Sequence, residues 1–340
     1  MAEEFPFVSV IVPMRDEERY IERCIRSLTA QDYPRDRFEV IVVDGGSEDG
    51  SRDVVESLCR EFASLRLIEN RDRQAARGLN LGLAYAEGDV IARLDGHAVA
   101  DPNFIRESVA AMQRTGADVV GGPITSLGEG AIGETIALAI SSPFGVGNAT
   151  FRYSTKEEWT DTVAFPAYRR DVFDRFGTFA EIEAGEDDEF HYRIRDGGGR
   201  ILLTPSIRAT YYGRRTYWEL ARQYFSYGQA KVVVLSRHPR RTRLRQLAPV
   251  CLVLAIIGTA IAAAFGGLML LPLAVLAGLY LGTSIGFSLG IARHHGWQHA
   301  IRLPLAFACM HFAYGLGFLS GLVRRSFGQP VAVPKEAEVP

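Results

Sequence analysis

The sequence predicts an α/β domain with a mostly parallel sheet, followed by apolar helices that meet a membrane. In the first part of the 340-residue chain, short apolar runs alternate with charged, helix-like segments. Such repeated strand–helix units build a doubly wound, Rossmann-like sheet. Residues 247–292 then contain no charged side chain in 46 positions, whereas one membrane span needs only about 20 apolar residues. The two parts therefore belong to different structural classes.

The first strand–helix unit sets the pattern for the sheet domain. A β-branched run at 7–12 ends at Pro13 and precedes a charged helical pattern at 17–31. A strand followed by a helix is the simplest interpretation of this order. The same alternation predicts further strands at 38–43, 65–68, 89–94, 117–120 and 200–204, and further helices at 51–62, 74–86 and 103–115.

One proline and two aspartates stand at the ends of predicted strands. Pro13, Asp44 and Asp95 each follow a buried-type run. Ligands of open α/β sheets bind outside the carboxyl ends of the strands. We therefore expect these three residues to line one crevice.

The second part predicts membrane attachment. We expect a cytoplasmic domain at 1–235, a basic linker at 236–246, a membrane region at 247–325 and a tail at 326–340. Spans at about 247–267 and 270–292 would form a hairpin that turns near Gly266 and Gly267. A third apolar segment at 303–322, interrupted by Pro304 and His311, either spans or lies in the interface.

The distribution of charged residues supports a cytoplasmic location for the first domain. A cluster of arginines, which suits anionic headgroups on the cytoplasmic side, precedes the first span: Arg237, Arg240, Arg241, Arg243 and Arg245. The first residues show neither the basic start nor the apolar segment of a secretory signal peptide. The net charge of −2 gives no general attraction to nucleic acid. We expect the sheet domain on the cytoplasmic side of the inner (plasma) membrane.

The cysteines give no metal or redox signal. Cys24, Cys59, Cys251 and Cys309 show no CxxC spacing. We interpret them as reduced structural residues.

Two strand-end segments carry candidate ligand-binding side chains. Asp44 opens a glycine-rich loop, where its carboxylate can accept hydrogen bonds from a base or ribose; the alternative is an aspartate that caps a turn. Asp95 and His97 flank a glycine and are plausible ligands for Mg²⁺ or Mn²⁺ bridging a diphosphate; the alternative for His97 is a hydrogen-bonded loop residue.

An acidic run supplies a candidate general base. Four carboxylates stand together at 186–189, beginning with Glu186 and Asp187. Mutual repulsion raises at least one pKa in such a run, which favours proton abstraction near neutral pH. The alternative is an acidic helix N-terminus that is stabilised by the helix dipole.

The segment before the basic linker predicts an amphipathic interfacial helix. Its aromatic residues lie near Arg222, Gln223 and Lys231. Aromatic and basic side chains together suit the membrane–water interface. The three polar residues are also candidates for contacts with phosphate or with an acceptor.

In their order along the chain, these segments resemble the inverting family-2 glycosyltransferases of the GT-A fold, over roughly 7–231. The run Arg-Leu-Asp-Gly-His-Ala at 93–98 is similar to that of membrane-associated enzymes of the succinoglycan-biosynthesis type. The resemblance implies a divalent ion, Mg²⁺ or Mn²⁺, at Asp95 and His97. It also implies that Asp187 is the catalytic base, with Glu186 beside it. The donor-binding residues that it implies are Pro13, Glu17, Asp44, Arg71, Asn80 and Asp95.

The resemblance further implies the reaction. A hexosyltransferase of this kind moves one sugar from a nucleotide-diphosphate sugar, here expected to be a UDP-sugar, with inversion. Processive relatives carry Gln-x-x-Arg-Trp, whereas Ser226 and Tyr227 follow Gln223 here, which favours single-sugar transfer. The apolar helices favour a lipid-linked (polyprenyl-diphosphate) saccharide as acceptor, in exopolysaccharide or cell-surface glycan synthesis. Two alternatives stay open: transfer to a polyprenyl phosphate itself, and a non-catalytic, membrane-bound protein that senses nucleotide sugars.

Overall fold

The computed structural model describes residues 5–147, 149–182, 184–265 and 270–328. The chain divides into two compact units. The first contains the chain up to Thr125 and Ala149–Tyr212, and the second contains Ser126–Asn148 and the chain from Gly213 onward. The expected turn at Gly266 and Gly267, and all but the first three residues of the 326–340 tail, lie outside the described residues.

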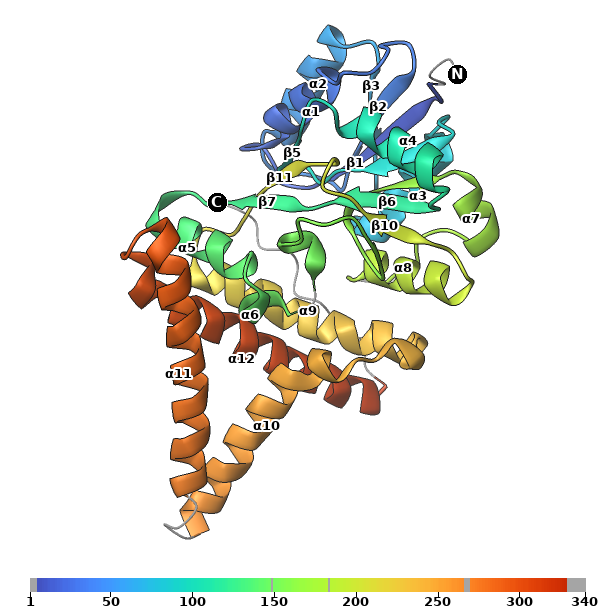
Figure 1. The fold of residues 1–340 in the computed structure, drawn as a ribbon. Helices are drawn as coiled ribbons and strands as arrows, with labels where there is room; N and C mark the ends of the chain where they lie inside the picture. Colours follow the sequence, from blue (N-terminus) through green and yellow to red (C-terminus); the bar gives the residue numbers. More distant parts are fainter. Residues whose placement is uncertain (1–4, 148, 183, 266–269, 329–340) are drawn as a thin grey trace. The chain divides into compact units, whose positions relative to one another are not determined.

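The first unit is built on an eight-stranded, mostly parallel sheet, as predicted (Figure 1). Its strand order is β3-β2-β1-β4-β9-β6-β10-β8. The parallel strands are β1 (Val8–Met14), β2 (Phe38–Asp44), β3 (Leu65–Glu69), β4 (Val90–Arg93), β6 (Val119–Gly122) and β10 (Ile201–Leu203). The antiparallel strands are β8 (Glu158–Thr160) and β9 (Ala164–Arg169).

Helices follow the strands in the alternation that the sequence predicts. They are α1 (Ile21–Thr29), α2 (Ser51–Glu61), α3 (Ala75–Tyr85), α4 (Phe104–Thr115), α7 (Asp171–Phe176), α8 (Glu186–Asp196) and the short 3-10 helix η1 (Thr150–Arg152). A small second sheet has the order β5-β11-β7. Its strands are β5 (Ala98–Ala100), β7 (Ile124–Leu127) and β11 (Ala209–Tyr212).

The register of the parallel strands places the loops that carry the candidate residues at one edge. Met14 pairs with Asp44 across β1 and β2. Ile11 pairs with Arg93 across β1 and β4, so Asp95 follows two residues beyond that strand. The polar loops after β1, β2 and β4 therefore leave the same carboxyl edge of the sheet, where ligands of such folds bind.

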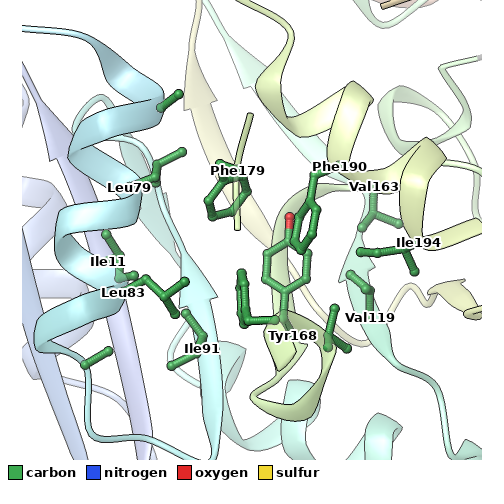
Figure 2. Packing of buried hydrophobic residues seen from close by; sticks show 14 of the residues in the cluster. Ile11, Leu79, Leu83, Ile91, Val119, Val163, Tyr168, Phe179, Phe190 and Ile194 are labelled. Carbon is green, nitrogen blue, oxygen red and sulfur yellow. The ribbon is translucent and has the colours of Figure 1, made fainter. Parts of the chain in front are cut away.

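An aromatic and aliphatic core holds α8 on the sheet. Tyr168 of β9 is 1% exposed and Phe190 of α8 is fully buried. Figure 2 shows both rings between Leu79 of α3 on one side and Ile194 of α8 on the other. Burial of one such side chain stabilises the fold by roughly 1.5–3 kcal/mol. This packing fixes the first turn of α8, where the acidic run lies.

The second unit is helical among its described residues. It contains α5 (Gly130–Ile140), α6 (Pro143–Val146), α9 (Tyr217–Arg237), η2 (Pro239–Arg241), α10 (Leu244–Phe265), α11 (Leu270–His295) and α12 (His299–Ser326). Three stretches are long and apolar enough to cross a membrane: Gln246–Ala264, Leu270–His295 and His299–Ser326. Their apolar character agrees with the predicted membrane association.

The third apolar segment forms a helix, as expected. Helix α12 continues through Pro304 and His311. The His311 ring is satisfied inside the unit: Nε2 lies 2.9 Å from the carbonyl oxygen of Phe144, and Nδ1 lies 3.0 Å from the Tyr280 hydroxyl. A polar side chain with such partners does not interrupt an apolar helix.

Candidate functional site

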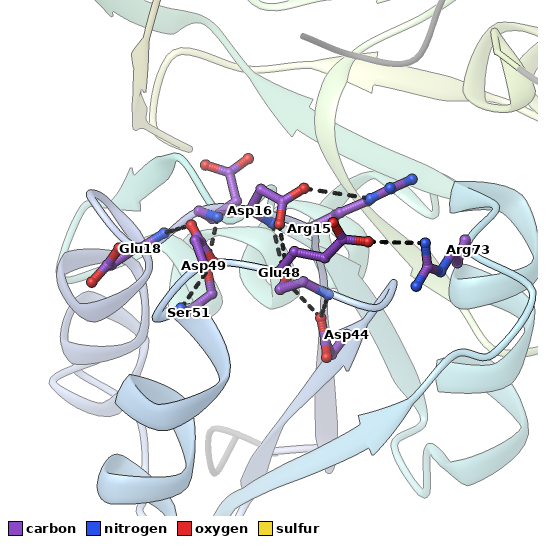
Figure 3. A network of polar contacts seen from close by, with 10 residues as sticks. Arg15, Asp16, Glu18, Asp44, Glu48, Asp49, Ser51 and Arg73 are labelled. Carbon is purple, nitrogen blue, oxygen red and sulfur yellow. Dashed lines mark hydrogen bonds and ion pairs between the residues drawn. The ribbon is translucent and has the colours of Figure 1, made fainter. Parts of the chain in front are cut away.

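The loop after β1 is held by side chains of the loop after β2 (Figure 3). The backbone N–H groups of residues 16, 17 and 18 donate to Ser47 Oγ, Ser51 Oγ and Asp49 Oδ2, at 3.0, 2.7 and 3.0 Å. Asp16 has a φ of +53°, which a helix does not allow. These contacts fix the backbone of residues 16–18 against the loop after β2, and α1 begins at Ile21 and not at the predicted residue 17.

Asp44 caps a turn with one carboxylate oxygen and leaves the other without a hydrogen-bond partner in the described chain. Its side chain is 1% exposed. Oδ1 accepts hydrogen bonds from the N–H and the hydroxyl of Ser47, at 2.9 and 2.7 Å, as a turn-capping aspartate does. Oδ2 is buried and has no hydrogen-bond partner in the described chain, and the Arg52 guanidinium is 3.7 Å away. A buried acceptor is costly when it is unpaired, so Oδ2 is free to accept an N–H or O–H of a ligand.

Asp95 and His97 form the turn after β4. A Cβ at the intervening Gly96 would lie 3.2 Å from Cγ of Glu17, so the glycine permits a tight approach to the first loop. His97 Nδ1 lies 2.7 Å from Glu17 Oε1. Burial disfavours the charged imidazole, but the facing Glu17 carboxylate outweighs it and raises the pKa of His97 to about 10. Glu17 and His97 therefore form an ion pair that joins the first loop to the β4 turn.

Arg93 joins the β4 turn to the acidic run. Its Nε donates to Asp95 Oδ1 and its Nη1 donates to Glu186 Oε1, each at 3.0 Å. The side chains are 14% exposed for Arg93 and 8% for Glu186. One planar guanidinium thus holds two carboxylates from segments far apart in the sequence, a geometry that lysine cannot reproduce.

Asp187 lies beside this pair in the first turn of α8. Gly185 precedes the helix at a φ of +78°, a conformation that glycine adopts easily. Burial, together with the charges of Glu186 and Asp188, raises the pKa of Asp187 to about 7, while Arg93 opposes the rise. The acidic run begins a helix, and its second carboxylate has a raised pKa that suits proton exchange near neutral pH. Its role as a base stays a prediction.

A buried histidine of α8 attaches this helix to the neighbouring strand. His191 is fully buried, and its Nδ1 and Nε2 lie 2.9 Å from the Thr162 hydroxyl and 3.0 Å from the Tyr168 hydroxyl. Burial lowers the pKa of His191 to about 4. The ring is therefore neutral, and its hydrogen bonds fix the position of α8 relative to β9.

The other residues that we expected to bind the donor have different surroundings in the structure. Asn80 uses both ends of its amide on the backbone N–H and C=O of Phe179, each at 2.9 Å, and so positions that loop. Arg71 is 88% exposed and lies 3.7 Å from Glu69. Pro13 lies inside β1, opposite Val43.

The three candidates in α9 belong to the second unit. Gln223 donates to the Tyr227 hydroxyl at 3.0 Å. Arg222 accepts a hydrogen bond from Ser226 through its backbone carbonyl. Lys231 is half-buried. For these residues a role with phosphate or acceptor stays a prediction.

Sequence reasoning missed the ion pairs that assemble the site. A signal for those of Arg93 does exist, because a charged residue at the end of an otherwise apolar strand needs a partner. The pairing of Glu17 with His97 has no sequence signal, since 80 positions separate the two residues.

The turn after β4 is compatible with Mg²⁺ or Mn²⁺. Hydrogen bonds within the described chain occupy neither Oδ2 of Asp95 nor Nε2 of His97. The described residues hold no group of three or more His, Cys, Asp or Glu side chains arranged around a metal position. Two protein ligands suffice for an ion that takes its remaining ligands from phosphate and water, as Mg²⁺ commonly does. His97 would have to release its proton first.

Comparisons with known proteins agree with this fold. The model of the family "Glycosyl transferase family 2" matches residues 9–177. A dolichyl N-acetyl-α-D-glucosaminyl phosphate glucuronosyltransferase of Methanococcus voltae is 27% identical over 68% of this chain and 74% of its own length. The succinoglycan biosynthesis protein ExoA of Rhizobium meliloti is 27% identical over 91% of this chain and 93% of its own length.

A solved structure shares the fold. It is the Pyrobaculum calidifontis mannosyltransferase PcManGT in complex with GDP-mannose and Mn²⁺, with a TM-score of 0.63, 23% identity, and coverage of 91% of this chain and 88% of the other. The fold and the family match define a nucleotide-sugar glycosyltransferase. The chain belongs to glycosyltransferase family 2 and has the GT-A fold.

Proposed function

We propose that the chain transfers one sugar from a nucleotide-diphosphate sugar to a lipid-linked saccharide, with inversion at the anomeric carbon. The observation that carries this proposal is the double ion pair of Arg93, which brings the Asp95 turn and the Glu186–Asp187 turn to one place. A transferase needs both functions there, because charge leaves with the diphosphate while a proton leaves the acceptor hydroxyl.

Asp187 is the general base in this mechanism. With a pKa of about 7, a large fraction of Asp187 is ionised at neutral pH and can accept the acceptor's hydroxyl proton. The acceptor oxygen forms its bond to the anomeric carbon as the bond from that carbon to the diphosphate breaks on the opposite face. A positioned base contributes about 10²- to 10⁴-fold to such a step.

The remaining site residues bind and orient the donor. Oδ2 of Asp44 accepts an N–H or O–H of the nucleoside, which satisfies its buried lone pairs. Asp95 and His97 would hold a divalent ion, whose charge offsets that of the leaving diphosphate. Arg93 and Glu17 keep these two side chains in place.

A lipid-linked acceptor has two supports. The second unit contains stretches long and apolar enough to cross a membrane, which an enzyme acting only on soluble sugars does not need. The name of the Methanococcus voltae relative gives a dolichyl-linked sugar phosphate as its acceptor. Basic residues before α10, including Arg240 and Arg241, favour the catalytic unit on the cytoplasmic side of the plasma membrane.

The experiment measures release of free nucleoside diphosphate from a panel of UDP- and GDP-sugars by membranes that carry the full chain. Each donor is tested with and without Mn²⁺ and with and without lipid extract. We expect turnover that needs both, and its loss in Asp187→Asn. Asp174→Asn, an exposed carboxylate of α7, is the matched control.

The product separates the acceptor classes. A lipid-linked oligosaccharide one sugar longer supports the proposal, whereas a sugar joined directly to polyprenyl phosphate, released by mild acid, replaces it with the simpler acceptor. Donor binding without turnover in any lipid extract would overturn transfer to lipid.

A further inference from the structure

The two ends of α12 lie at the two ends of α9 within the second unit. At the start, the Tyr217 hydroxyl donates to the carbonyl oxygen of Arg302 at 3.2 Å. At the end, Arg325 Nη1 donates to Ser236 Oγ at 2.7 Å. Helices α9 and α12 therefore run side by side in the same direction, as Figure 1 also shows.

Glycines allow these two helices to touch along their length. A Cβ at Gly228 of α9 would lie 2.2 Å from the carbonyl oxygen of Tyr314, and one at Gly317 of α12 would lie 2.0 Å from that of Phe225. Gln229 also donates to Ser320 at 3.2 Å. Backbones at such close approach, with a side-chain hydrogen bond between them, define one rigid layer of two helices.

Helices α10 and α11 have a different character. Only 11% and 6% of their most apolar windows are buried within the protein, against 44% for α12. Side chains such as Ile261 of α10 and Leu279 of α11, 57% and 66% exposed, point away from any protein partner. Helices that are apolar and unburied belong in lipid.

Chain connectivity fixes which ends share a side of the membrane. Four residues join Phe265 to Leu270, and three join His295 to His299. Links this short reach less than about 20 Å, which is less than a hydrocarbon core of about 30 Å. If α10 and α11 span, the end of α11 and the start of α12 therefore lie on the side where α10 begins.

The far end of α12 lies on that side as well. Arg325 is hydrogen-bonded to Ser236, and Ser236 precedes the start of α10 at Leu244 by only eight residues. A helix with both ends on one side of a bilayer cannot cross it.

We propose that α12 lies in the plane of the membrane surface, that α10 and α11 are the two spanning helices, and that both ends of α12 lie on the side where α10 begins. The exposed face of α12 contacts a bilayer that has anionic headgroups. Exposed apolar residues recur on one face of α12 at helical spacing: Ile301, Leu305, Leu316 and Val323. Arg302 stands near one end of this stripe and Arg324 and Arg325 at the other, where they meet lipid phosphates.

The first test is the sidedness of single cysteines in the full-length chain. The four native cysteines are replaced by serine, and Trp297→Cys, Ser326→Cys or Gly267→Cys is added. Membrane vesicles of known orientation are then treated with an impermeant maleimide. We expect positions 297 and 326 to react from one face and position 267 from the other. Reaction of 326 from the same face as 267 would make α12 a third span and overturn the proposal.

The second test measures depth and needs no catalysis. Spin labels are placed on cysteines at Ile301, Leu316 and Val323 of the reconstituted chain, in vesicles with and without anionic lipid. An in-plane helix gives three similar, shallow depths, and anionic lipid strengthens the attachment. A spanning helix would place 316 and 323 about 10 Å apart in depth, because each residue rises 1.5 Å; that result would refute the in-plane arrangement even if the maleimide pattern were incomplete.

Discussion

Arg93 Nη1 and Glu186 Oε1 lie 3.0 Å apart although 93 positions separate the two residues in the sequence. The same guanidinium binds Asp95, so three charged side chains form one partly buried unit. A single side chain thereby joins the turn after β4, where we propose a metal ion, to the first turn of α8, where we propose the base.

Replacement of Arg93 tests this link. Arg93→Gln leaves two carboxylates without their cation, and Arg93→Lys supplies the charge but not the two-sided fork. A hydrogen bond to a charged group contributes about 1.5–3 kcal/mol, so we expect kcat to fall about 10- to 100-fold in both variants. Arg169→Gln, which breaks an exposed pair with Asp171, is the control and should leave kcat unchanged.

The two Arg93 variants should differ in how their rates depend on pH. Arg93 lowers the pKa of Asp187, so its loss should move the rising limb of the rate profile to higher pH in Arg93→Gln and much less in Arg93→Lys. Identical profiles for wild type and Arg93→Gln would show that the guanidinium does not act on the base.

Asp187 sets the pH dependence of turnover. A base with a pKa of about 7 is protonated and inactive below that pH, so the rate should rise with pH through about 7 and then level. Asp187→Asn should lower kcat about 10²- to 10⁴-fold and leave the KM for the donor nearly unchanged. Single-turnover measurements across pH 5–9 check both statements, and a variant with full kcat would exclude Asp187 as the base.

Asp44 should act on donor binding and not on chemistry. In Asp44→Asn, an NH₂ group can replace the acceptor Oδ2. Loss of one ligand hydrogen bond with an unpaired buried group left behind costs about 1–3 kcal/mol, so the Kd for nucleoside diphosphate should rise roughly 5- to 150-fold. Calorimetric titration of the variant beside Asp53→Asn, an exposed residue of α2, measures this effect. Equal affinities would remove Asp44 from the donor site.

His191 makes the first unit sensitive to acid. Burial lowers its pKa from the ordinary value of 6.5 to about 4 in the folded chain. The unfolded chain therefore binds more protons between these values, and stability falls as the pH drops from about 6.5 to 4. The full shift corresponds to about 3 kcal/mol.

His191→Gln should be less stable at pH 7 but should lose less stability on acidification. Thermal unfolding of the detergent-solubilised chain at pH 7 and pH 5 measures both, with the exposed His294→Gln as control. An acid sensitivity equal to that of wild type would contradict the role of His191.

The contact between α9 and α12 predicts that a glycine substitution within it destabilises the chain, whereas one outside it does not. Gly228→Ala places a Cβ 2.2 Å from a backbone oxygen of α12 and should lower the melting temperature. Gly282→Ala in α11 meets no atom within 4 Å and should be neutral or stabilise the helix by roughly 0.5–1 kcal/mol. Thermal unfolding of both variants in the same detergent measures the two melting temperatures. Equal values would argue against close packing at Gly228.

The sequence by itself determined the strand–helix alternation, the parallel sheet and the apolar character of the C-terminal helices. These features are local: periodicity, β-branched runs and the absence of charge act within one segment. Local pattern also placed Asp44 and Asp95 at strand ends and Asp187 in an acidic helical turn. It did not place the start of α1, because side chains of the loop after β2, which is distant in sequence, fix the backbone of residues 16–18.

Only the tertiary structure decided which polar side chains meet. Glu17 with His97, Arg93 with Glu186, and Arg325 with Ser236 are separated by 80, 93 and 89 positions. No local preference encodes such pairs, since they form only when sheet register and helix packing bring distant segments together. The same physical reason explains α12: its composition fits a membrane span as well as a surface helix, and its two ends are fixed by contacts with α9.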